Sequence, residues 1–453
     1  MPLPVLLWSL ISLALCTGCS RRAKPRPGVP PKHLILVTIE GLRADHCSAY
    51  AYARQTTSFP IDGYGHEQGR ALTIDDLANS GVLFRHAMSP SSDPDQALAS
   101  VLIGARPLEL AAGQVPPTLG LAERFAEAGF LCAGFVSRPG EGLPAEWRRG
   151  FHRYAEKPSD LETLAPAITF ASEHDWGSGR GVFLWLHLSS PAPPFVPRSF
   201  DQAYFGSEVD YASLFTDPQY QGPARSMLAS EAPEGPARLT QADQQFLAGL
   251  YDGEVAFSAY LLWYALDLMR YFTETEDSLS QAVFCVAGAS GVELDRERIE
   301  ELGWGGTTDA ALGVPLLLRH PESMTGRRIL KALASLEDLG PTMIDWFGLA
   351  GRGDWRGRSL LGVTDARPRE RFEPGPSCSY DPSSDQLTAR GLVWRLTVPR
   401  SELGRQGEPL PAQAQLTAVE SLRHIPDAPG AEVALELLEA LRAWGGASPV
   451  AVR

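Results

Sequence analysis

Cysteine is scarce in this sequence, and the few cysteines show no pairing pattern. Only six of the 453 residues are cysteine, and Cys16 and Cys19 belong to the N-terminal apolar segment. The other four are widely spaced: Cys47, Cys132, Cys285 and Cys378. Cys132 and Cys285 lie within apolar runs of strand length. We therefore expect buried thiols rather than a disulfide framework or a zinc site.

Basic charge is also in short supply. The chain has 40 lysine and arginine residues against 54 aspartate and glutamate residues, a formal net charge of -14. This diffuse acidic balance argues against nucleic acid as a partner, because the phosphate backbone would be repelled. Heptads, internal repeats and long low-complexity tracts are absent as well. What remains is an ordinary globular composition, long enough for one large α/β domain with a smaller one appended.

The N-terminal apolar run, residues 5–15, is too short to span a bilayer. It is typical of the apolar region of a signal peptide, and it is followed by Thr17, Gly18 and Cys19. These three residues fit the end of a bacterial lipoprotein processing site, at which the cysteine thiol is acylated. Cys16 replaces the usual leucine, and no basic residue precedes the apolar run. A plain secretory signal or a short uncleaved anchor is therefore the alternative.

We expect residues 1–19 to be a signal peptide with a lipidated Cys19, followed by a basic, proline-rich tether over residues 20–31. The protein would then be exported and held on the membrane of a bacterial cell envelope by its lipid anchor. The tether either adds attraction to anionic lipid or serves as a solvated spacer. Ser20 after the cysteine favours the outer membrane, at its periplasmic face or surface.

The rest of the chain alternates apolar runs of strand length with amphipathic helical stretches, which indicates an α/β fold with a mainly parallel central sheet between helix layers. The expected strands are residues 33–40, 131–137, 181–188, 282–288 and 314–320. The expected helices are residues 73–81, 118–129, 241–272, 335–351 and 431–444. We expect a main domain over residues 32–365 and a small, turn-rich C-terminal subdomain over residues 366–453.

Several stretches occur in the order and spacing of one known family. They are "HLILVTIEGLRADH", "ALTIDDLANSGVLFRHAMSP", "FLWLHLSSPAPPFVP", "YDGEVAFSAYLLWYALDLM" and "SLEDLGPTMIDWFGLAG". Between about residue 32 and residue 361 the chain resembles the sulfatase family of the alkaline phosphatase superfamily. The resemblance implies the α/β fold of that family, with a metal loop after the first strand and a nucleophile at the start of a helix.

Members of this family attack a sulfate or phosphate ester with an alcohol-type nucleophile beside a divalent cation, and their oxygen-rich ligand set suits Ca²⁺ or Mg²⁺. The motif "ASVLIG", residues 99–104, aligns the nucleophile position with Pro94. The positions that assist the nucleophile fall on Gln96, Ala97 and Leu98. Proline has no hydroxyl and leucine cannot stabilise an oxyanion. The resemblance therefore implies a degenerate site with no catalytic residue.

The metal positions have changed in the same direction. The resemblance places the first pair of aspartate ligands on Glu40 and Gly41, and only Glu40 could still bind a cation. The aspartate and histidine of the second metal loop fall on Ala289 and Ser290, and a further aspartate position falls on Ser190. We therefore expect no cofactor, with Ca²⁺ or Mg²⁺ only if other carboxylates rebuild the site.

Carboxylates near these loops could in principle do so. Asp93 and Asp95 flank the nucleophile position, and Glu293 and Asp295 follow the second loop. With Glu40, Asp93 and Asp95 would supply a relocated cation site; the alternative is that they are solvated or cap a helix.

Other polar residues have structural explanations. Arg43 and Asp45 are expected to form a capping or ion-pair group. His187 is expected to be a packed, hydrogen-bonded histidine, and His46 a loop residue with no evident partner.

Three functions stay open at this point. The first is a membrane-anchored sulfatase-like pseudoenzyme that binds a sulfated or phosphorylated ligand, or a protein partner, in its altered cleft. The second is a divergent metal-dependent sulfuric or phosphoric ester hydrolase that uses Glu40. The third is a scaffold protein whose surface makes protein contacts.

Overall fold

The computed structural model describes residues 31–58, 72–116, 118–138, 140, 142–176, 178–193, 195, 199–202, 207–211, 213–225, 238–272, 282–294, 303–320, 328–361, 375–419 and 431–445. The expected signal peptide with Cys19, the tether up to residue 30, and Asp295 lie outside these described residues. Within the described ranges, no helix is both long enough and apolar enough to cross a membrane.

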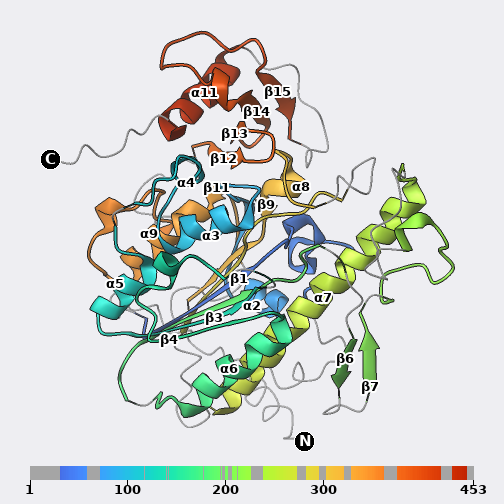
Figure 1. The fold of residues 1–453 in the computed structure, drawn as a ribbon, viewed down its shortest axis with the longest axis vertical. Coiled ribbons are helices and arrows are strands. Elements are labelled where there is room, and N and C mark those ends of the chain that lie inside the picture. The colour runs from blue at the N-terminus through green and yellow to red at the C-terminus, as the bar shows by residue number, and fades with distance from the viewer. Residues whose placement is uncertain are drawn as a thin grey trace, which may run out of the picture.

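A sheet of nine strands forms the centre of the molecule (Figure 1). Its order is β11-β2-β10-β8-β1-β5-β3-β4, and β9 pairs with β2. The strands are β1 (His33–Ile39), β2 (Val82–Met88), β3 (Leu131–Ser137), β4 (Arg153–Lys157), β5 (Val182–Leu188), β8 (Ala282–Gly288), β9 (Gly313–Val314), β10 (Leu316–Arg319) and β11 (Arg328–Ser335). β9 and β10 run antiparallel to their partners, and the other pairs are parallel. The expected mainly parallel α/β sheet is confirmed.

Helices cover both faces of this sheet. Because side chains alternate along a strand, Leu34 and Leu36 of β1 enter one core while Ile35 and Val37 enter the other. The first core contains α3 (Pro94–Leu102), α5 (Leu121–Glu127) and α9 (Leu339–Trp346), and the second contains α2 (Ile74–Ser80), α6 (Asp160–Glu173) and α7 (Gln241–Phe272). Every residue of β1, β5 and β8 is buried, as a strand covered on both faces requires.

Smaller elements complete the main domain. They are α4 (Pro107–Ala111), α8 (Asp309–Leu312) and the antiparallel pair β6 (Ser199–Gln202) and β7 (Ser207–Asp210).

The apolar runs locate β1, β3, β5 and β8 to within one residue, and the long helical stretch is the single helix α7. Residues 314–320 differ from the expectation of one strand. They are divided between β9 and β10 at Pro315, which has no N–H to donate to the ladder. The search for apolar runs did not predict β2 and β4, because charged residues such as Arg85 and Arg153 interrupt these strands. Cys132 and Cys285 are buried free thiols, as expected.

The C-terminal part is a four-stranded antiparallel sheet with one helix packed on it, rather than the expected turn-rich stretch before a helix. The strands are β12 (Ser377–Asp381), β13 (Gln386–Arg390), β14 (Trp394–Pro399) and β15 (Gln415–Ala418), and the helix is α11 (Ala431–Gly445). Leu438 and Leu441 of α11 pack against Leu387 and Leu396 of the sheet. The strands are short, so their alternating pattern is weak in the sequence.

One buried carboxyl joins this C-terminal unit to the main domain. Glu337, just before α9, accepts a hydrogen bond from the Trp444 indole Nε1 of α11 at 2.9 Å. Arg106 donates to the Trp444 carbonyl oxygen at 2.6 Å, and its Nε lies 3.8 Å from the Glu337 carboxyl. Burial raises the pKa of Glu337 to about 7, although the Arg106 charge opposes the shift.

We expect Glu337 to make the folded chain less stable as the pH rises from about 4.5 to about 7. Its folded pKa lies above the ordinary value of 4.5, so its contribution is complete below that value and is lost as the pH rises through about 7. The difference between the two pKa values corresponds to on the order of 3 kcal/mol. Urea unfolding of the wild type and of Glu337→Gln, from about pH 4 to about pH 8, measures this effect. The stability of the wild type relative to the variant should fall over this range; a constant difference would contradict the assignment.

Candidate functional site

Three segments meet at the carboxyl edge of the sheet, where ligands of open parallel sheets bind. β1 and β8 are parallel neighbours, and the Ala289 N–H donates to the Ile39 carbonyl at 2.8 Å. Ser89, which follows β2 and leads to α3, donates from its hydroxyl to the Ala289 carbonyl at 2.7 Å. The loop after β1, the start of α3 and the 288–291 loop were expected to converge at one edge, and these contacts bring them together.

Glu40 directly follows β1 and is held by a buried histidine. Its Oε1 lies 3.1 Å from His187 Nε2, and His187 Nδ1 lies 2.8 Å from the Thr38 hydroxyl. That hydroxyl also accepts from the Trp185 indole N–H at 2.9 Å. A carboxylate accepts hydrogen bonds, so Nε2 donates to Glu40, while Nδ1 pairs with the Thr38 hydroxyl. His187 is the packed, hydrogen-bonded histidine that the sequence predicts.

Pro94 occupies the first turn of α3 and supplies no reactive group. Asp93 caps the helix, because its carboxylate accepts from the backbone N–H groups of Asp95 at 2.9 Å and Gln96 at 3.1 Å. Proline suits the next position, where the helix needs no N–H donor. Burial raises the pKa of Asp93, and the nearby carboxylates of Asp95 and Glu40 add to the shift. The segment that starts with a nucleophile in the resembling family is here an ordinary capped helix start.

Asp95 forms a bidentate ion pair with Arg138, which the sequence did not predict. Its two carboxylate oxygens accept from Nη1 and Nη2 of Arg138, each at 2.5 Å. Arg138 directly follows β3, so a neighbouring strand end supplies the guanidinium. The hydrogen bond to Asp95 raises the pKa of Arg138, and the charges of Glu40 and Glu156 contribute. The positively charged Arg138 guanidinium therefore lies among the carboxylates of this edge.

The residues present do not fit a Ca²⁺ or Mg²⁺ ion. Such an ion needs about six oxygen ligands, several of them charged. Gly41 and Ala289 have no side-chain oxygen that could bind a metal. The Ser290 hydroxyl is fully buried and has no hydrogen-bond partner among the described residues. Asp95 is already neutralised by Arg138, whose charge would repel a dication. In the described part of the chain, no group of three or more His, Cys, Asp or Glu side chains is arranged to hold a metal.

Glu293 is also engaged elsewhere. Its carboxylate accepts from the Thr308 hydroxyl, and its backbone pairs with that of Gly303.

A second polar cluster fixes the loop after β1 against α7. Asp252 of α7 is fully buried and accepts from His46 Nδ1 at 2.7 Å, the Tyr52 hydroxyl at 2.8 Å and Arg54 Nη1 at 2.5 Å. The partner of His46, which was not evident in the sequence, is Asp252, 206 residues away. The neighbouring Tyr251 hydroxyl donates to the Gly41 carbonyl at 2.5 Å and accepts from an N–H of the same loop.

The expected ion pair in this loop is confirmed. Arg43 Nη2 lies 2.8 Å from Asp45 Oδ2, and Arg43 Nη1 donates to the Val292 carbonyl at 3.0 Å.

No protein-family model matches the chain, and no curated protein matches its sequence. The fold is nevertheless shared with solved structures. The phosphonate monoester hydrolase of Agrobacterium radiobacter is 15% identical, with a TM-score of 0.61 over 92% of this chain and 96% of that one. The phosphonate monoester hydrolase of Silicibacter pomeroyi is 18% identical, with a TM-score of 0.55 over 81% and 87%.

A 2-O GAG sulfatase is likewise similar, at 15% identity and a TM-score of 0.58 over 82% of each chain. The chain therefore shares the fold of these sulfatase and phosphonate monoester hydrolase structures. This confirms, at the level of fold, the family resemblance that the sequence motifs carry.

Removal of the Asp252 carboxylate should destabilise the chain strongly. In Asp252→Ala, His46, Tyr52 and Arg54 would lose their common buried acceptor. Breaking a buried charge pair from one side costs roughly 3–5 kcal/mol. Urea unfolding should register this loss, whereas Glu127→Ala, at an exposed helix end, should change stability by less than about 0.5 kcal/mol. Equal stability of the two variants would contradict a structural role for Asp252.

Proposed function

We propose that this chain uses a sulfatase-type fold without the ester-hydrolysing chemistry associated with that fold, and that it acts by binding at the altered carboxyl edge of its sheet. The observation that carries the proposal is the start of α3. Pro94 stands where the resemblance places the nucleophile. The next residue, Asp95, forms an ion pair with Arg138. An ester at this edge would meet neither an alcohol at the aligned position nor a set of ligands suited to a metal.

The charges at this edge favour a protein partner over a sulfated or phosphorylated ligand. The carboxylates of Glu40, Asp93 and Asp95 interact with one another there, and the Arg138 guanidinium interacts with those of Asp95 and Glu40. A sulfate or phosphate group would therefore meet net negative charge, and like charges at close range repel. A partner surface that carries basic or neutral groups avoids this repulsion.

We also propose that the chain is exported and anchored to a bacterial cell envelope membrane through a lipid on Cys19. Support comes from the "TGC" sequence after the apolar run and from the place where the tether joins the domain. The tether leads to the amino end of β1, and Glu40 follows its carboxyl end. At about 3.3 Å per residue, these points lie roughly 23 Å apart, so an anchor would leave the altered edge uncovered.

The purified chain should not hydrolyse aryl sulfates or aryl phosphates, with or without added Ca²⁺ or Mg²⁺. Loss of a nucleophile alone costs on the order of 10⁶-fold in turnover where catalytic groups act as a unit. Pro94→Ser should therefore restore no turnover, because the metal ligands would still be missing. Release of the aryl alcohol measures the rate. Turnover that needs a dication, survives stringent purification and disappears in Glu40→Ala would instead establish the divergent hydrolase.

Metabolic labelling with a fatty-acid analogue should mark the wild-type chain in a bacterial host that processes lipoproteins. Cys19→Ala should lose the label, because acylation requires that thiol. Cys16→Ala is the matched control, since it removes a cysteine three residues away and should stay labelled. Equal labelling of the two variants, or no labelling of the wild type, would remove the lipid anchor from the proposal.

A further inference from the structure

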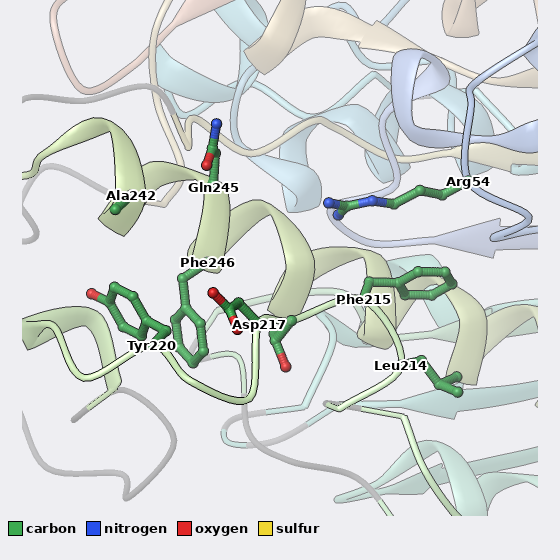
Figure 2. Close-up of a pocket in the computed structure, with 9 residues that line it drawn as sticks. Arg54, Leu214, Phe215, Asp217, Tyr220, Ala242, Gln245 and Phe246 are labelled. Atoms are coloured by element: carbon green, nitrogen blue, oxygen red, sulfur yellow. The ribbon is translucent and has the colours of Figure 1, made fainter.

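A pocket of about 540 Å³ lies beside the first turns of α7, and it shares no residue with the altered edge (Figure 2). Its lining residues are Arg54, Leu214, Phe215, Thr216, Asp217, Tyr220, Ala242, Gln245 and Phe246. Small-molecule pockets commonly enclose about 300–1,000 Å³, so its volume suits one small ligand. Three separate parts of the chain contribute: the loop after β1, residues 214–220, and α7.

Close packing and hydrogen bonds hold the lining residues of this pocket in place. A Cβ on Gly249 of α7 would lie 2.5 Å from the Phe215 carbonyl oxygen, so only glycine lets residues 214–216 approach the helix this closely. The Tyr220 ring stacks on Phe246 with 4.1 Å between centroids. The Tyr220 hydroxyl is bound to Asp243 and accepts from the Ala224 N–H at 3.0 Å. These contacts form the pocket before any ligand arrives.

One part of the lining is apolar and partly uncovered. Phe215, Tyr220 and Phe246 supply aromatic surface, and Leu214 keeps 41% of its surface exposed. Aromatic faces pack well against flat apolar groups of a ligand. A purely ionic ligand would leave this surface without a partner.

The other part of the lining offers both hydrogen-bond donors and acceptors. Arg54 supplies N–H groups, Asp217 supplies carboxylate oxygens, and the exposed Gln245 amide supplies both kinds of group. Two contacts hold Arg54 in place. Its Nη1 donates to the buried Asp252 carboxylate at 2.5 Å, and its guanidinium lies over the Phe215 ring, 5.8 Å from the ring centroid. The side chain is therefore positioned rather than free to swing.

The charges of the lining disfavour an anionic ligand and attract a cation only weakly. Asp252 already balances Arg54, which leaves little positive charge for an anion. Asp217 is exposed, so water and salt screen its attraction for a cation. A neutral molecule with an apolar face and several hydroxyl groups matches both parts of the lining.

We propose that this pocket binds one uncharged sugar ring, at a site separate from the altered edge. The C–H face of the ring packs on Phe215 and on the Tyr220–Phe246 pair, while its hydroxyl groups bond to Arg54, Asp217 and Gln245. The inference does not depend on whether the edge at Glu40 hydrolyses esters.

Binding of uncharged trisaccharides built from glucose, galactose, mannose, xylose or N-acetylglucosamine tests this site. Saturation-transfer NMR on the intact chain should detect at least one of them, and calorimetry should then give its Kd. Gln245→Ala should weaken binding about three- to tenfold through one lost hydrogen bond. Ala242→Trp should abolish binding by filling the pocket; both positions are exposed on α7, so the fold should survive.

Gln241→Ala is the matched control, because Gln241 is exposed on the same helix turn but does not line the pocket. It should bind like the wild type. Singly sulfated forms of the same sugars should bind no better than the neutral ones. Three outcomes would overturn the proposal: no binding anywhere in the panel, binding of sulfated forms alone, or equal loss in Gln241→Ala and Gln245→Ala.

Discussion

The loop that follows β1 is held by two adjacent residues of α7, and the arrangement of the carboxyl edge depends on that attachment. The Tyr251 hydroxyl binds the backbone of the loop at Gly41 and Arg43. The Asp252 carboxylate accepts hydrogen bonds from three side chains of the loop and of the residues that follow it. Both residues are fully buried, so these bonds form where water cannot compete. With the loop fixed, Glu40 and the ion pair of Arg43 with Asp45 take defined positions, and so does Arg54, which lines the pocket near α7.

The carboxyl edge of the sheet is polar, and groups of the protein itself bind its carboxylates. In this chain Glu40 turns to His187, Asp93 caps α3, and Asp95 pairs with Arg138. Each carboxylate thus has a protein donor, which reduces the cost of burying charge without a metal. The same contacts hold these side chains of the edge in fixed positions.

The C-terminal sheet contributes to this edge as well. The Ser92 hydroxyl, next to the cap of α3, donates to Asp381 at 2.8 Å, and Ser91 donates to the Tyr380 carbonyl at 3.0 Å. Burial opposes ionisation of Asp381, but hydrogen bonds from Ser384, Ser383 and Ser92 lower its pKa. The start of α3 is therefore held from two sides, by Arg138 on the main sheet and by the β12–β13 hairpin. The C-terminal unit is part of the framework of the site.

The sequence by itself determined the central layers and the residue types that stand at the carboxyl edge of the sheet. Strands buried on both faces need continuous apolar runs, so β1, β5 and β8 could be located directly, and α7 could be located from its helical periodicity. The residues at the aligned nucleophile and metal positions, such as Pro94 and Ala289, are also visible in the sequence. Their chemistry follows from residue type alone.

Tertiary structure decided which charges meet. Asp95 and Arg138 lie 43 residues apart, and His46 and Asp252 lie 206 apart. No local pattern encodes such pairs, because they arise where strand ends and a long helix converge after folding. The C-terminal sheet and the pocket beside α7 belong to the same class: each is assembled from short or separate segments whose individual signals are weak. Residue type set which side chains stand at the carboxyl edge, and packing of distant segments set which of them meet.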